Sequence, residues 1–149
     1  MTLHRAVPPI VTAAGLFGVD RIVKWLAVRY LSDGGVFLVP DSTGVVFERN
    51  QGIAYGIPLP LPVLIVLVSV ILIVTVAVGI HAFRRTDQRL LWGAALIFCG
   101  AAANAIDRIR YGWVVDTFVL TGWPVFNVAD LMILAGAVLV AVHLIRRRA

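Results

Sequence analysis

Long apolar runs alternate with short polar segments along this 149-residue chain. A helix needs about 20 apolar residues to span the hydrocarbon core of a bilayer. Four runs reach or approach this length, at about 7–31, 59–83, 90–106 and 126–145. The second run is nearly free of charge, whereas the first is interrupted by Asp20, Arg21 and Lys24. The pattern predicts four transmembrane helices.

The composition agrees with this prediction. The chain is 60% hydrophobic and 14% charged, whereas soluble domains have about 45–50% apolar and about 25% charged residues. We therefore expect one integral-membrane domain over residues 1–149, with no separate soluble domain. The single cysteine, Cys99, lies inside an apolar run, so no disulfide within the chain is possible.

Arginines mark the expected orientation, because short cytoplasmic loops of membrane proteins are rich in Lys and Arg. Seven fall on one side of the predicted spans, namely Arg5, Arg84, Arg85, Arg89, Arg146, Arg147 and Arg148. Three fall on the other, namely Arg49, Arg108 and Arg110. We expect both termini to be cytoplasmic and segments 32–58 and 107–125 to face outward. The net charge of +5 thus indicates topology rather than nucleic-acid binding.

The outward segments contain short β-like stretches. Residues 34–39 and 44–49 read as strands bounded by turn residues, and 114–120 fits either a strand or a helix. The expected fold is an all-α membrane bundle with a small extracytoplasmic β-sheet or cradle and a short outer loop or helix.

Two aspartates stand at the outer edge of the predicted membrane region. Ionisable groups at membrane depth are costly and by default mark function. Asp116 and Asp130 could share one proton and one water, which is the minimum equipment for aspartic-type hydrolysis. Asn127 precedes Asp130 by three residues, and helix capping explains Asn127 well. Capping explains Asp130 less well, since apolar sequence follows it at once.

Three further polar clusters favour a structural interpretation when each is taken alone. Asp20 and Lys24 lie four residues apart on one helix face and predict an ion pair. Asn104, Asp107 and Arg108 share one face near a helix end. There Arg108 would hold its neighbour Asp107 ionised, as part of a structural network.

The segment 50–56, with Asn50 and Gly52, is most simply a turn.

Other chemistries fit the sequence less well. His4, His81 and His143 fall near the cytoplasmic ends, so His-based catalysis or a His metal site at the outward clusters is disfavoured. Ser69 has no His or Lys partner in reach for a serine protease. A carrier or channel using Asp20, Asp107 and Asp130 remains the main alternative. It would need polar groups near the midplane, whereas nearly all lie in the outward half.

Five motifs occur in order along the chain. They are Asp20-x-x-x-Lys24, the segment 50–56 (Asn-Gln-Gly-Ile-Ala-Tyr-Gly), Asn104-x-x-Asp107-Arg108, Gly112-x-Val-Val-Asp116 and Phe126-Asn-x-Ala-Asp130. Together they resemble prolipoprotein signal peptidase, also called signal peptidase II. A different intramembrane aspartyl protease is disfavoured, because its Tyr-Asp and Gly-x-Gly-Asp pairs are absent.

The resemblance implies a bacterial inner-membrane aspartic endopeptidase with its site near the outer face. Its substrate would be a diacylglyceryl-modified prolipoprotein in membrane lipid, cut just before the lipidated cysteine. Asp116 and Asp130 would be the catalytic pair. The supporting or substrate-binding residues would be Asp20, Lys24, Asn50, Gly52, Asn104, Asp107, Arg108 and Asn127. The resemblance implies no metal, no cofactor and no nucleic acid, and we expect a monomer.

Four departures from the family pattern stand out. Arg21 replaces a common Gln, Ala103 replaces a usual Gly, and Thr117 replaces a usual Phe. The spacing between Asp116 and Asp130 is also short, which trims the outer loop. These differences bear on loop shape and substrate preference rather than on the chemistry.

Overall fold

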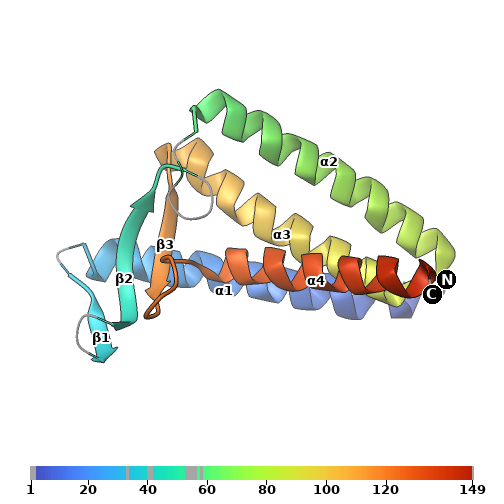
Figure 1. Cartoon of the computed structure of the whole chain (residues 1–149), viewed down its shortest axis with the longest axis horizontal. Coiled ribbons are helices and arrows are strands. Elements are labelled where there is room, and N and C mark those ends of the chain that lie inside the picture. The colour runs from blue at the N-terminus through green and yellow to red at the C-terminus, as the bar shows by residue number, and fades with distance from the viewer. Residues whose placement is uncertain (1–2, 33, 40–41, 53–56, 58, 149) are drawn as a thin grey trace.

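Four long helices and a three-stranded sheet make up the computed structural model, which describes residues 3–32, 34–39, 42–52, 57 and 59–148. The helices are α1 (Val7–Tyr30), α2 (Leu61–Arg85), α3 (Gln88–Tyr111) and α4 (Val128–Arg148), preceded by the short 3-10 helix η1 (Leu3–Arg5). The strands are β1 (Val36–Val39), β2 (Thr43–Asn50) and β3 (Val114–Val119). The predicted fold class is confirmed (Figure 1). Residues 53–56 of the predicted turn lie outside the described residues.

Three of the helices are long and apolar enough to cross a membrane, over Pro62–Arg85, Gln88–Tyr111 and Val128–Arg147. At 1.5 Å per residue, the 24 residues of α1 extend about 36 Å, which also suffices. What sets α1 apart is its charge, and Asp20 and Lys24 are buried inside the protein. The prediction of four spans thus agrees with four helices of adequate length.

Helix α3 is the centre of the bundle, because α1, α2 and α4 all pack against it. Close approach of α3 and α4 depends on small residues. A Cβ atom at Gly100 would lie 2.5 Å from the carbonyl oxygen of Ala129, so only glycine fits there. This contact brings the start of α4 against the outer half of α3.

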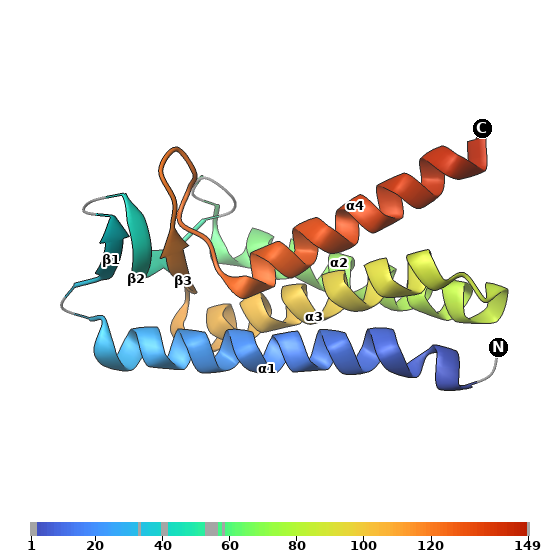
Figure 2. The ribbon, with the colours of Figure 1, turned by 90° about the horizontal axis from the view of Figure 1, so that it is seen from below.

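The sheet is antiparallel, with strand order β1-β2-β3. Strand β3 settles the ambiguous stretch 114–120 as a strand, in which Asp116 lies opposite Glu48 of β2. The chain then folds back after β3, because Phe118 and Phe126 form an isolated antiparallel bridge. Figures 1 and 2 show the sheet at one end of the bundle and both chain termini at the other.

Candidate active site

Asn127 joins the two aspartates that the sequence singled out. Its side-chain Nδ2 donates to Oδ1 of Asp116 at 2.6 Å, and its backbone N–H donates to Oδ2 of Asp130 at 3.1 Å. The N–H of Asp130 donates back to Oδ1 of Asn127 at 2.9 Å. This reciprocal pair has the pattern of a capping box at the start of α4. Capping therefore accounts for Asp130 as well as Asn127, which the sequence analysis did not foresee.

Each aspartate also accepts a bond from a second asparagine. Asn50, at the end of β2, donates to Oδ2 of Asp116 at 2.9 Å. Asn104, on α3, donates to Oδ1 of Asp130 at 2.8 Å. All four carboxylate oxygens are thus held by amide donors, and two separate helices and two strands fix the pair.

Burial changes the acidity of Asp116, which is only 2% exposed to solvent. Loss of hydration disfavours the charged form and raises the pKa of Asp116 to about 6. The bond from Asn50 opposes this shift, and the negative charge of Asp130 adds to it. Asp116 therefore holds a proton more readily than an ordinary surface carboxyl.

A buried ionic cluster lies directly beneath the pair. The ammonium of Lys24 lies 3.1 Å from Oδ2 of Asp20 and 2.8 Å from Oδ2 of Asp107, and it donates to Oδ1 of Asn104 at 2.8 Å. The predicted ion pair between Asp20 and Lys24 is confirmed. Arg21 completes the cluster through a bond of 2.6 Å to Oδ1 of Asp107, so two cations balance two carboxylates.

The carboxylates of this cluster also fix the backbone beside each aspartate of the pair. Asp20 accepts from the N–H of Ala129 at 2.9 Å, and Ala129 immediately precedes Asp130. Asp107 accepts from the N–H of Val115 at 3.3 Å, and Val115 immediately precedes Asp116. The ionic cluster thus fixes the positions of Asp116 on β3 and Asp130 on α4.

Arg108 belongs to the predicted network but forms no ion pair with Asp107 among the described residues. Asp107 pairs with Lys24 and Arg21, and its charge acts on Arg108 only over a longer distance. Adjacent helix residues point in different directions, and Arg108 instead donates to the carbonyl oxygen of Gly52 at 3.0 Å. The N–H of Gly52 in turn donates to Oδ1 of Asn50 at 2.9 Å. Arg108 thereby anchors the end of β2 that carries Asn50.

All ten residues singled out from the sequence therefore lie in one connected network. Sequence reasoning gave Arg21 no part in the site, although it noted Arg21 as a charge in the first apolar run and as a departure from the family pattern. Its signal was present, because a third charge inside an apolar run calls for a partner. The backbone N–H groups of Val115 and Ala129 carried no sequence signal at all.

Nothing in the described part of the chain points to a metal centre, since no group of three or more His, Cys, Asp or Glu side chains there is placed to hold an ion. His143 lies at the far end of the bundle, where its Nδ1 is 3.0 Å from Asp87. The ionisable side chains near the aspartates gather at one end of the helices rather than along a path through them.

A family model described as "Signal peptidase (SPase) II" matches residues 12–146. This chain belongs to the signal peptidase II family. It is a multi-pass membrane protein of an aspartic peptidase family. The matched range covers α2, α3, the sheet and most of α1 and α4, and it includes both aspartates.

Similar signal peptidases occur in distant bacteria. The lipoprotein signal peptidase of Solibacter usitatus is 34% identical over 144 residues, which cover 90% of this chain and 88% of that protein. That of Pelotomaculum thermopropionicum is 37% identical over 124 residues, covering 83% and 82%. That of Geobacillus thermodenitrificans is 32% identical over 145 residues, covering 94% and 91%.

Two solved structures described as bacterial membrane enzymes share the fold. One has a TM-score of 0.82 at 24% identity and covers 95% of this chain and 89% of its own. The other has a TM-score of 0.77 at 25% identity and covers 91% of each.

Arg21 offers a test of the ionic cluster beneath the site. Its side chain is 24% exposed, and Arg21→Met removes a charged bond while leaving Asp20 and Asp107 with one ammonium between them. We expect a loss of roughly 1–3 kcal/mol in the free energy of unfolding, measured by thermal unfolding in detergent. Arg21→Lys should retain most of the stability. The same substitution at exposed Arg89, which has no ion pair or cation–π contact among the described residues, should have little effect, and an equal loss there would contradict the assignment.

Proposed function

We propose that this chain is an aspartic endopeptidase that removes the signal peptide from lipid-modified prolipoproteins, with Asp116 and Asp130 as its catalytic pair. One observation carries the assignment, namely that Asn127 holds both carboxylates in one site at the sheet end of the bundle. The family supplies the reaction class, and relatives of similar length carry the name lipoprotein signal peptidase.

The proposed reaction is general acid–base hydrolysis of a peptide bond. One ionised aspartate takes a proton from a water molecule, whose oxygen attacks the scissile carbonyl. The other aspartate, protonated, donates to the carbonyl oxygen, and a proton then passes to the departing amine as the C–N bond breaks. Two close carboxylates cannot both ionise cheaply, so the pair titrates as a unit. This chemistry needs no cofactor.

The supporting residues keep the pair in position during this reaction. Asn50, Asn104 and Asn127 orient the carboxylate oxygens, and each oxygen retains a second lone pair for water or substrate. Asp116 is buried whereas Asp130 is partly open, so we assign the approach of substrate to the side of Asp130. Every group needed comes from one chain, which supports a monomer as the active unit.

The proposed substrate is a prolipoprotein carrying a diacylglyceryl group, cut before its modified cysteine. The site stands where the apolar helices meet the sheet, which is the depth of a peptide bond beside a lipid-anchored residue. Exposed apolar side chains, including Leu38 of β1 and Trp123 after β3, offer contact with lipid near the site. The acyl chains would enter sideways from the bilayer.

We also propose that the site faces outward from the cytoplasmic membrane of a bacterium. The seven arginines of the arginine-rich side lie near the two termini, at the end of α2 or at the start of α3. Both termini lie at the end opposite the sheet (Figure 2). The inward preference of Lys and Arg then places that end in the cytoplasm.

Reporter fusions test this orientation. Fusions at residues 40 and 118 should report an external location, and a fusion at residue 86 should report a cytoplasmic one. The reverse pattern would place the aspartates inside the cell and contradict the proposed substrate.

Asp116→Asn and Asp130→Asn test the catalytic pair. Neither amide can take a proton from water, so each change should abolish nearly all cleavage of a lipidated prolipoprotein in liposomes. The double variant should lose little more, because the two residues act as a unit. Each substitution also replaces one accepting carboxylate oxygen by an NH2 group that faces an N–H donor, so we expect about 0.5–1.5 kcal/mol of lost stability.

Glu48→Gln is the matched control for that experiment, because Glu48 is an exposed carboxylate directly opposite Asp116 in the sheet. It should cleave at close to the wild-type rate. Turnover within a few-fold of wild type for either aspartate variant, with the fold retained, would refute the aspartic mechanism for this chain.

Asn50→Leu tests how the pair is tuned. The Asn50 amide stabilises ionised Asp116 and so lowers its pKa, and its removal should raise that pKa further. The shared proton would then be lost at a higher pH, and the alkaline limb of the pH profile of kcat/KM should shift to higher pH. Glu48→Gln should leave the limb nearly in place. A limb that moves downward in Asn50→Leu would contradict this function of the amide.

A further inference from the structure

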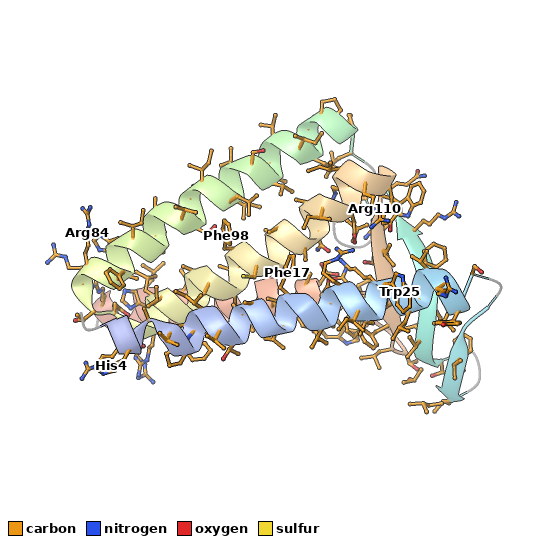
Figure 3. All side chains as sticks on the ribbon, turned by 180° about the vertical axis from the view of Figure 1, so that it is seen from behind. His4, Phe17, Trp25, Arg84, Phe98 and Arg110 are labelled. Atoms are coloured by element: carbon orange, nitrogen blue, oxygen red, sulfur yellow. The ribbon has the colours of Figure 1, made fainter. Side chains whose placement is uncertain are left out.

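An apolar groove of about 610 Å³ lies at the end of the bundle opposite the catalytic pair. Its walls come from the first half of α1, the last part of α2 and the first half of α3. Small or apolar residues dominate the lining, including Ala14, Gly79, Ala95 and Phe98. Figure 3 shows Phe98 between α2 and the rest of the bundle.

The inside of the groove has little to offer a polar ligand. The hydroxyl of Thr75 in its wall already donates to the carbonyl oxygen of Ile71, at 2.8 Å on the same helix. Helix α2 packs mainly on α3, so the protein itself leaves the space between α1 and α2 open. A hydrocarbon chain is the ligand that such a surface accommodates at no electrostatic cost.

The mouth of the groove carries positive charge. Arg84 is the one charged residue among the described residues that line it, and its side chain is exposed. None of the ion pairs between described residues involves Arg84. Arg85 follows it directly, and Figure 3 shows His4 at the same end of the molecule. The ligand should therefore combine an apolar chain with an anionic head.

We propose that this groove binds an anionic phospholipid of the cytoplasmic leaflet, with one acyl chain between α1 and α2 and its phosphate on Arg84. Basic pockets between transmembrane helices on the cytoplasmic side bind anionic lipid head groups. The lipid fills the space between two helices that share α3 as their common support. This site is separate from the catalytic pair and independent of the proposed reaction.

The positive charge at the mouth favours this ligand over two other possible occupants of the groove. A signal peptide carries a basic segment ahead of its apolar run, and Arg84 with Arg85 would repel that segment. A second copy of the chain would bring its own arginine-rich end to the same place. An anionic phospholipid satisfies both the apolar walls and the charged mouth.

Lipid titration of the purified full-length chain in detergent tests the proposal. Phosphatidylglycerol and phosphatidylethanolamine with identical acyl chains are compared by native mass spectrometry and by thermal unfolding. Phosphatidylglycerol should bind more tightly and raise Tm further. Arg84→Ala should weaken its binding about tenfold, or about 1.4 kcal/mol, because it removes the charged bond to the phosphate. Arg89→Ala, which changes an exposed arginine in the first turn of α3 that does not line the groove, should bind like wild type.

A second variant tests the chain-binding part of the groove. A Cβ atom at Gly79 would lie 3.8 Å from the Cβ atom of Ala94, an ordinary contact, so Gly79→Leu can fill the groove without a backbone clash. It should reduce binding of both lipids. Gly18→Leu on α1 points into open space and should bind both lipids normally.

Three outcomes would overturn the proposal. Equal affinity of wild type and Arg84→Ala for phosphatidylglycerol would remove the head-group contact. Undiminished binding in Gly79→Leu would remove the groove. Competitive inhibition of prolipoprotein cleavage by phosphatidylglycerol, relieved in Gly79→Leu, would assign the groove to the signal peptide instead.

Discussion

The site depends on the contacts that the buried ammonium group of Lys24 makes. It is 1% exposed and contacts Asp20, Asp107 and Asn104. A buried charge is tolerable only when it is paired and hydrogen-bonded, so the two carboxylates must converge on it from different helices. Those carboxylates also accept hydrogen bonds from the backbone N–H groups of Ala129 and Val115. One cation thereby fixes the backbone immediately ahead of both Asp116 and Asp130.

The hydrogen bonds that cap helix α4 also hold the two aspartates together. Asn127 and Asp130 satisfy each other's N–H groups at the start of α4, as a capping box does, and Asn127 still has an amide nitrogen to hold Asp116. The positive end of the helix dipole favours negative charge at Asp130. Burial of Asp116 acts in the opposite sense and raises its pKa.

Much of this was predictable from sequence, because apolar runs and buried charges follow strong physical rules. The four helices, two strands and the partnership of Asp20 with Lys24 were all anticipated. The partner of Asp107 was not, since the choice between Arg21 on another helix and the adjacent Arg108 depends on how α1 and α3 rotate against each other. The stretch 114–120 was also undecided, because only its pairing with β2 makes it a strand. Backbone donors such as Ala129 leave no mark in the sequence.

Different kinds of interaction hold the helices together in the site and along α2. At the sheet end, hydrogen bonds and ion pairs between α1, α3, α4 and two strands leave little freedom, as a reaction that depends on proton position requires. Along α2, by contrast, the hydroxyls of Ser69 and Thr75 bond only to carbonyls of their own helix among the described residues, and apolar side chains make the contacts with α3. Apolar packing of that kind is less directional than the ion pair and the hydrogen bond by which Lys24 joins α1 to α3 beside the two aspartates.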